Sequence, residues 1–267
     1  MTDARLNTLI QWLEGLEPSW QLDLHSLAPA SADASFRRYF RIESKNPKFA
    51  TLIVMDAPPQ HEPLDAFLKV DSLFSDAGLN VPKVLEKNIG LGFLLLNDLG
   101  TKTYLSELND VSANHLYKDA TQALVQMQLA SKPNVLPDYD KVLLQRELDL
   151  FPEWYLKKHL GFDLSQAQQV QLEKAFGLII ENNLAQAKVY VHRDYHSRNL
   201  MVTKEHNPGV IDFQDAVYGP ITYDASSLWR DAYIEWPEEK VLDWVIQFWE
   251  EGRRVGLPMP NDFGEFY

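Results

Sequence analysis

The feature that most constrains this chain is a short polar motif that leads into an apolar hairpin. His192-Arg193-Asp194 is followed by Asn199, and Asp212 closes an apolar run thirteen positions after that asparagine. Residues 199–213 contain two apolar, β-favouring segments joined by a polar turn with proline, which predicts a hairpin. A hairpin of this length would bring the carboxamide of Asn199 and the carboxylate of Asp212 together.

The residue types in this motif suit a particular chemistry. Asp194 can accept the proton of a hydroxyl group, and Asn199 and Asp212 can offer oxygen ligands to Mg²⁺, which needs few protein ligands beside water and phosphate. The spacing H-R-D-x-x-x-x-N followed by Asp-Phe is typical of the catalytic loop and metal segment of protein kinases, although Gln214 stands where glycine is usual. H-R-D alone would indicate only a surface ion pair. The complete set predicts a kinase-like site with ATP and Mg²⁺ as cofactors.

Composition excludes several other classes of protein. The 267 residues suffice for two parts with cores of their own, and the 45% hydrophobic and 24% charged content is that of an ordinary globular protein. A net charge of −13 argues against a nucleic-acid partner. The absence of cysteine excludes disulfides and thiolate chemistry. No basic-then-apolar leader and no apolar run of about 20 residues is evident, so we expect a cytoplasmic protein without a membrane partner.

A turn of small residues precedes the first clear strand. Residues 31–35 read Ser-Ala-Asp-Ala-Ser, and residues 36–42 alternate as a strand does. Such a turn lets backbone N–H groups approach phosphate, although without the motif downstream an ordinary hairpin would be the preferred interpretation. The candidate ATP contacts that we infer here and at the turn after residue 96 are Ser31, Asp33, Ser35, Arg38, Asn97, Asp98 and Leu99.

The second strand lacks a residue that a protein kinase needs. Residues 51–55 form a buried-looking strand, and a kinase carries a phosphate-binding lysine on it, but here Met55 or Asp56 occupies that place. Arg37, Arg38 or Arg41 from the preceding strand could supply the positive charge.

The pattern changes from strand to helix near residue 100. We expect a first domain over residues 1–98, a nucleotide-binding antiparallel sheet with a helix at 63–77, and a helical second domain over residues 99–267. We also expect a helix over 225–236, capped by Asp224. The aromatic segment 151–155 carries a carboxylate, which suits a sugar, although aromatic stripes are more often core. The candidate acceptor contacts are Glu153, Trp154, Asp215 and Tyr218.

These residues together carry a family resemblance. The chain resembles the aminoglycoside phosphotransferase and choline kinase family of small-molecule kinases, with Asp194 matching its base and Asn199 and Asp212 its metal ligands. Segments 31–41, 54–59, 150–155 and 212–220 are most similar to the bacterial N-acetylmuramate/N-acetylglucosamine anomeric kinases of cell-wall recycling.

The resemblance implies an α+β, bilobal protein-kinase-like fold and transfer of the γ-phosphoryl group of ATP to the anomeric hydroxyl of a small sugar. It also implies that the chain ends before its second lobe is complete, because similar proteins continue past position 267 with further helices. Two alternatives stay open: a kinase for an aminoglycoside or amino alcohol such as choline, and a non-catalytic nucleotide-binding module. The oligomeric state is also left open.

Overall fold

The computed structural model of the protein describes residues 3–31 and 36–267. By their contacts these residues fall into two units, one made of residues 1–108 and 198–214 and the other of residues 109–197 and 215–267. Within the described ranges, none of the helices combines the length and the hydrophobicity that crossing a bilayer requires.

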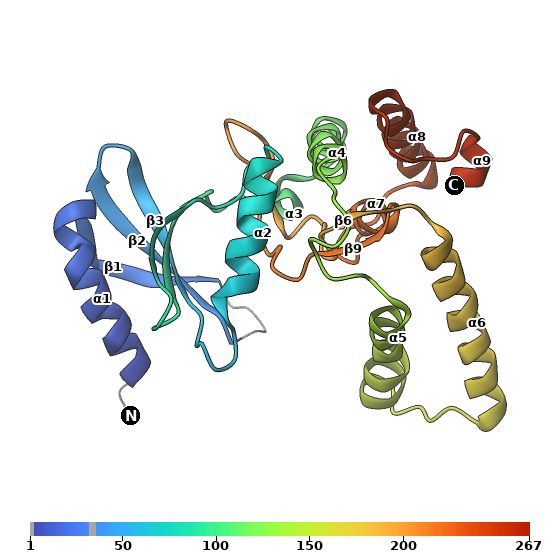
Figure 1. Ribbon diagram of the computed structural model, residues 1–267, viewed down its shortest axis with the longest axis horizontal. Coiled ribbons are helices and arrows are strands. Elements are labelled where there is room, and N and C mark those ends of the chain that lie inside the picture. Colours follow the sequence, from blue (N-terminus) through green and yellow to red (C-terminus); the bar gives the residue numbers. More distant parts are fainter. Residues whose placement is uncertain (1–2, 32–35) are drawn as a thin grey trace. The chain divides into compact units, whose positions relative to one another are not determined.

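The first unit is built on a five-stranded antiparallel sheet with the strand order β1-β2-β3-β5-β4. Its helices α1 and α2 lie on opposite sides of the strands β1 to β3 (Figure 1). A separate two-stranded hairpin, β7 with β8, belongs to the same unit. The elements are α1 (Ala4–Trp20), β1 (Leu22–Ser31), β2 (Arg38–Asn46), β3 (Phe49–Asp56), α2 (Leu64–Asp76), β4 (Val84–Asn88), β5 (Phe93–Asn97), α3 (Tyr104–Glu107), β7 (Leu200–Met201) and β8 (Gly209–Val210).

Alternation along the strands decides which side chains meet which helix. Phe40 of β2 lies opposite Val54 of β3, and both belong to the apolar core that includes Leu9 and Leu13 of α1. Successive strand residues point to opposite faces, so Arg41 and Met55 lie on the face away from α1. Burial of this core is the main stabilising term of the unit, because each fully buried apolar side chain contributes roughly 1.5–3 kcal/mol.

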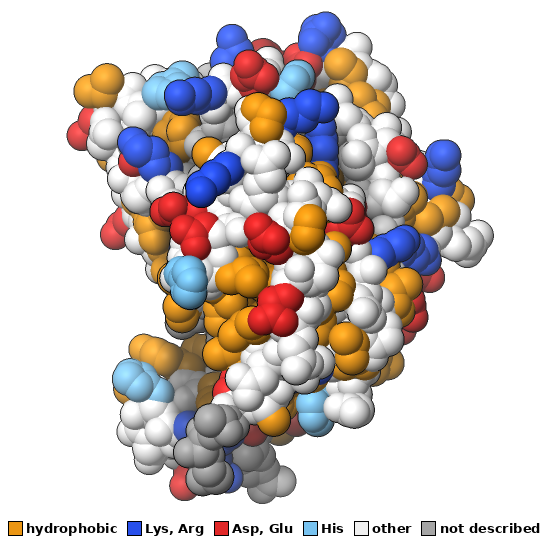
Figure 2. Space-filling view, turned by 90° about the vertical axis from the view of Figure 1, so that its left-hand side faces the viewer, with side chains coloured by type: hydrophobic (Ala, Val, Ile, Leu, Met, Phe, Trp, Pro, Cys, Tyr) orange, Lys and Arg blue, Asp and Glu red, His pale blue; other side chains and the backbone are white. Residues whose placement is uncertain are grey.

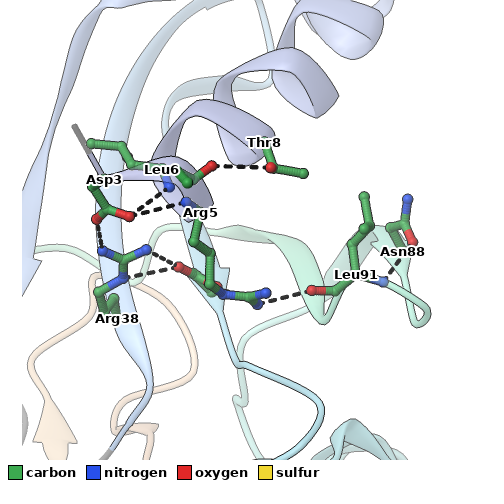
Figure 3. A network of polar contacts seen from close by, with 9 residues as sticks. Asp3, Arg5, Leu6, Thr8, Arg38, Asn88 and Leu91 are labelled. Atoms are coloured by element: carbon green, nitrogen blue, oxygen red, sulfur yellow. Dashed lines mark hydrogen bonds and ion pairs between the residues drawn. The ribbon is translucent and has the colours of Figure 1, made fainter. Parts of the chain in front are cut away.

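A network of charges closes the α1 side of the sheet. Asp3 caps α1 by accepting hydrogen bonds from the backbone N–H groups of Arg5 and Leu6, and it also pairs with Arg38 (Figure 3). The carboxylate of Asp56, which is fully buried, accepts from Nε of Arg5 at 2.6 Å and from Nη2 of Arg38 at 2.5 Å. The residue at the expected lysine position is therefore either apolar Met55 or an aspartate that pairs with two arginines.

The second unit is mainly helical. Its short sheet pairs β6 with β9 in antiparallel register, and Ser165 begins α6 with a complete capping box. The aromatic segment after α5 continues it as a π-helix, η1. The elements are α4 (Ala113–Leu129), α5 (Lys141–Leu150), η1 (Phe151–His159), α6 (Gln166–Ala185), β6 (Lys188–Val191), β9 (Val217–Pro220), α7 (Tyr223–Trp229), α8 (Glu238–Val255) and α9 (Phe263–Phe266).

Three features of the fold differ from the expectations from sequence. Strand β1 was not expected, because its register shifts between Asp23 and Ala28 and interrupts the alternation of apolar residues. Helix α7 ends at Trp229, so the expected helix over 225–236 is wrong in both bounds. The strands of the expected hairpin are only two residues each, β7 and β8.

Charged side chains are mixed by sign over the face drawn in Figure 2, where Lys and Arg stand among Asp and Glu. A net charge of −13 spread in this way is typical of a solvated surface, and it offers no continuous basic patch on that face for a polyanion.

Candidate active site

The metal hairpin, which we define as residues 198–214, brings Asn199 and Asp212 together. Leu200 pairs with Val210, and the N–H of Ile211 donates to the carbonyl of Asn199 at 3.1 Å. As a result, Nδ2 of Asn199 lies 3.4 Å from Oδ2 of Asp212. The predicted convergence of these two side chains is thus present in the first unit.

The donor set fits a hard divalent cation. A carboxylate oxygen and a carboxamide oxygen are ligands that Mg²⁺ accepts, and rotating the Asn199 amide by a half-turn would present its oxygen where the nitrogen now lies. Among the described residues, no group of three or more His, Asp or Glu side chains is arranged to hold a metal ion. The candidate is the pair of Asn199 and Asp212, and water and phosphate would complete the coordination.

Gln214 has a role that the sequence did not reveal. It replaces the usual glycine, and its Nε2 donates to Oδ1 of Asp212 at 2.8 Å. This hydrogen bond orients the carboxylate and leaves Oδ2 on the side of Asn199. Asp212 itself has a φ of +66°, a conformation that costs about 1 kcal/mol or more in a residue other than glycine.

The metal hairpin is held to the rest of the first unit by backbone hydrogen bonds and apolar packing. The N–H of Val210 donates to the carbonyl of Asn80 at 2.8 Å, and the N–H of Val202 donates to the carbonyl of Lys102 at 2.8 Å. Phe213 is fully buried, with its ring 5.1 Å from that of Phe67 and 5.8 Å from that of Phe74, both on α2.

The catalytic loop, which we define as residues 192–197, belongs to the second unit and presents Asp194 as an exposed side chain. His192 is fully buried and its Nδ1 accepts the N–H of Asp194 at 3.3 Å, so it braces the loop. Arg193 has a φ of +80°, which is strained for a side chain with a Cβ. Neighbouring groups must stabilise this conformation.

Asp224 supplies that stabilisation. One oxygen of its fully buried carboxylate accepts the N–H of His192 at 2.7 Å, and the other accepts the N–H of Arg193 at 3.0 Å. We expected Asp224 to cap the following helix, which was wrong: α7 begins at Tyr223, and the carboxylate turns to the catalytic loop instead. Burial raises the pKa of Asp224 to about 7, despite these two hydrogen bonds.

Two further contacts fix the same loop. The N–H of Ser197 donates to Asp231 at 2.9 Å, just beyond the end of α7. The guanidinium of Arg193 pairs with Glu147 of α5 at 2.7 Å and lies 5.8 Å from the ring centre of Tyr139. Glu147 is thus a carboxylate partner of Arg193.

The residues expected to contact ATP have structural partners in the first unit. Arg41 makes a two-pronged pair with Asp98, at 2.6 and 3.0 Å, and Oδ1 of Asn97 accepts the N–H of Lys83. Burial, the largest single influence, would raise the pKa of Asp98. The hydrogen bonds from Arg41, the N–H of Gly100 and Thr51, together with the charge of Arg41, outweigh burial, and the pKa is lowered. Asp33 and Ser35 lie outside the described residues, and of Ser31 only the backbone, at the end of β1, is described.

The three arginines considered as lysine substitutes each pair with a carboxylate. Arg37 pairs with Glu62 at 2.6 Å, Arg38 with Asp3 and Asp56 on the α1 face, and Arg41 with Asp98 on the Met55 face. Arg41 therefore lies on the same face as Met55, and Arg38 on the opposite one. Leu99 is half-buried and closely approaches Gly209, where an added Cβ would lie 3.0 Å from the leucine side chain.

The expected acceptor contacts are all in the second unit. Trp154 is exposed on η1, with Nζ of Lys158 3.3 Å from its ring centre, and Glu153 pairs with that lysine at 3.3 Å. Asp215 is exposed, whereas Tyr218 is half-buried in β9, where its ring meets Tyr190 edge to face.

Known proteins that are similar to this chain show its family. Residues 26–258 match the phosphotransferase enzyme family (APH). Over 99% of its length the chain is 43% identical to the N-acetylmuramate/N-acetylglucosamine kinase of Pseudomonas aeruginosa, of which it covers 79%. It is 46% identical over 97% of its length to the enzyme of the same name from Neisseria meningitidis, of which it covers 76%.

Solved structures show the same fold at low sequence identity. An ADP-bound aminoglycoside phosphotransferase superposes with a TM-score of 0.63 at 14% identity, covering 96% of this chain and 85% of the other. An aminoglycoside phosphotransferase from Streptomyces rimosus, in complex with ADP and streptomycin, superposes with a TM-score of 0.62 at 15% identity. The superposition covers 100% of this chain and 97% of the other. These likenesses confirm the α+β, protein-kinase-like fold predicted from sequence. The chain belongs to the phosphotransferase enzyme family.

Proposed function

We propose that this phosphotransferase uses ATP and Mg²⁺ to phosphorylate the anomeric hydroxyl of N-acetylmuramate or N-acetylglucosamine. The observation that carries the proposal is the pairing of Asn199 with Asp212 in a chain whose catalytic loop exposes Asp194. The identity of 43% and 46% to kinases named for these sugars supports the choice of acceptor. A cytoplasmic location, where ATP is available, completes the proposal.

The chemistry assigned to Asp194 is proton removal. Its carboxylate takes the proton of the anomeric hydroxyl as the sugar oxygen forms a bond to the γ-phosphorus of ATP. The bond from that phosphorus to the bridging oxygen breaks, and ADP leaves with the electron pair. Proton transfer by a well-placed side chain typically contributes a factor of about 10² to 10⁴ in rate.

Asn199 and Asp212 would hold the metal ion, and Gln214 would keep the carboxylate of Asp212 in its orientation. A bound Mg²⁺ neutralises charge on the phosphate oxygens of the nucleotide. The charge that a strand lysine would provide is assigned to Arg37, Arg38 or Arg41, each of which would have to share its present carboxylate partner with phosphate. Alanine variants of each, with apparent ATP affinity as the readout, separate these three.

The remaining site residues stay proposals. The backbone around Ser31, Asp33 and Ser35 is assigned to the phosphates, and the segment Asn97, Asp98 and Leu99 to the adenine. For the acceptor, we propose the exposed groups Glu153, Trp154 and Asp215, together with Tyr218.

The experiment that tests the acceptor is a panel assay with ATP·Mg. The protein is incubated with N-acetylmuramate, N-acetylglucosamine, an aminoglycoside and choline, and ADP release is measured together with the phosphorylated product. We expect turnover of the amino sugars and product labelled at the anomeric position. Turnover of the aminoglycoside or choline without that of either sugar would replace the proposal with the alternative acceptor class.

A further inference from the structure

A chain of alternating charges leads from the catalytic loop to the surface of the second unit. Oε1 of Glu147 lies 2.7 Å from Nη2 of Arg193 and 3.3 Å from Nη2 of Arg146. One carboxylate oxygen is thus shared between two guanidinium groups. Arg193 directly precedes Asp194, so this chain begins beside the proposed base.

The two arginines differ in how firmly they are held. The side chain of Arg193 is 16% exposed, and besides Glu147 it has the ring of Tyr139 and the charge of Asp215 around it. The side chain of Arg146 is 68% exposed, and its contact is the longer one, to an oxygen that already accepts a shorter bond. Arg146 is therefore the more accessible of the two arginines to a ligand from solution.

Glu147 is the acid on α5 that contacts Arg146, whereas Asp149 has another partner. Asp149 lies one turn after Arg146, but its Oδ1 accepts from Nε2 of Gln145 at 2.8 Å. The chain as a whole carries a net charge of −13, so an anionic ligand is attracted only where a local cation such as Arg146 is exposed.

We propose that Arg146 recognises the carboxylate of an anionic amino sugar and so distinguishes it from a neutral one. The inference rests on the proposed function. N-acetylmuramate differs from N-acetylglucosamine by a lactyl ether that ends in a carboxylate, and a guanidinium binds a carboxylate through two parallel hydrogen bonds. Glu147 positions Arg146 relative to the catalytic loop, because the same oxygen holds Arg193.

Recognition of a group remote from the reacting hydroxyl acts on binding. The carboxylate is bound equally in the ground state and in the transition state, so its loss raises KM and leaves kcat unchanged. We expect about a tenfold effect, equal to about 1.4 kcal/mol, on the anionic sugar alone.

The test compares kcat and KM for N-acetylmuramate and N-acetylglucosamine in the wild type, Arg146→Gln and Arg146→Lys. Lys141→Gln removes another exposed cation from the same helix and is the matched control. Arg146→Gln should raise KM for N-acetylmuramate about tenfold with no change for N-acetylglucosamine, and the effect should shrink at high salt. Arg146→Lys should retain part of the preference, and Lys141→Gln all of it.

Equal changes for both sugars, or none for either, would overturn the role of Arg146 while the proposed function stands. Turnover of the neutral sugar alone by the wild type would also overturn it. If the wild type uses the anionic sugar alone, the effect of Arg146→Gln on the KM for that sugar is compared with its effect on the KM for ATP. A rise in the KM for the sugar without a rise in the KM for ATP supports the inference. No rise in the KM for the sugar, or an equal rise in both, overturns it. Turnover of neither sugar would remove the proposed function, and this inference with it.

Discussion

The catalytic loop and the metal hairpin follow one another directly in sequence, yet they are held by different forces. In the loop, backbone N–H groups donate to two aspartates: His192 and Arg193 to Asp224, and Ser197 to Asp231. The hairpin is held by strand pairing and by hydrogen bonds from the N–H groups of Val202 and Val210 to neighbouring backbone carbonyls. Phe213 also packs against aromatic rings of α2.

The difference shows that carboxylates hold the loop of the proposed base, Asp194, whereas backbone pairing holds the metal ligands. The base lies on a loop with a strained residue, Arg193, which regular pairing cannot stabilise. The metal ligands flank two short strands, whose pairing sets their separation by itself. Removing the Asp224 carboxylate should therefore disorder the catalytic loop. Removing the Gln214 amide should affect only the metal affinity of the hairpin.

The largest effect is expected from Asp224→Ala. Two N–H groups of the catalytic loop lose their acceptor, and each buried donor without a partner costs about 1–3 kcal/mol, so unfolding should be easier by about 2–6 kcal/mol. kcat should fall as well, because the loop loses its orientation, while the KM for ATP changes little. Denaturant unfolding and steady-state kinetics measure both.

Asp224→Asn keeps one acceptor oxygen and should lose less stability and less kcat. It therefore tests the same contacts even if Asp224→Ala does not fold. Asp243→Ala, an exposed acid on α8, is the control and should change stability by less than about 0.5 kcal/mol. A stable, fully active Asp224→Ala would contradict the account of the loop.

A smaller and more selective effect is expected from Gln214→Ala. The carboxylate of Asp212 loses the donor that orients it, and loss of such a supporting hydrogen bond typically weakens metal binding about 10- to 100-fold. Titration of activity with Mg²⁺ should shift to higher concentrations, while kcat at saturating Mg²⁺ stays close to the wild-type value. An unchanged Mg²⁺ requirement would show that Gln214 does not orient Asp212.

The smallest effect is expected from Asp71→Asn, on the α2 helix that supports the hairpin. Burial raises the pKa of Asp71 to about 7 from 3.8, so the folded state holds this proton more tightly than the unfolded state. The stability it contributes is present below about pH 4 and is lost as the pH rises through about 7.

Asp71→Asn should therefore unfold like the wild type near pH 4 and be more stable at about pH 8. The gain should be about 1–2 kcal/mol, reduced because solvent reaches the carboxyl group. Its Mg²⁺ requirement should not change, since the contacts of α2 with Phe213 are apolar. A shift in that requirement would mean that the hairpin, like the loop, depends on a charge.

The sequence could predict the metal hairpin, which depends on local pairing, better than the support of the catalytic loop, which depends on distant residues. The hairpin of Asn199 and Asp212, the capping of α6 by Ser165 and the strands around Val54 follow from local patterns, and the structure contains them. Asp224 could not be recognised, because an aspartate in a first helical turn normally serves its own helix, and its partners lie about thirty residues earlier. The pair of Arg193 and Glu147 joins residues 46 positions apart in sequence, and no local pattern marks it.

The central claim is that the exposed carboxylate of Asp194 removes the proton of the acceptor hydroxyl. The direct measurement is phosphoryl transfer by Asp194→Ala at saturating ATP·Mg and amino sugar, with nucleotide binding followed separately by calorimetry. We expect kcat to fall by a factor of about 10² to 10⁴ with the affinity for ATP unchanged. A variant that phosphorylates the sugar as fast as the wild type would contradict the claim.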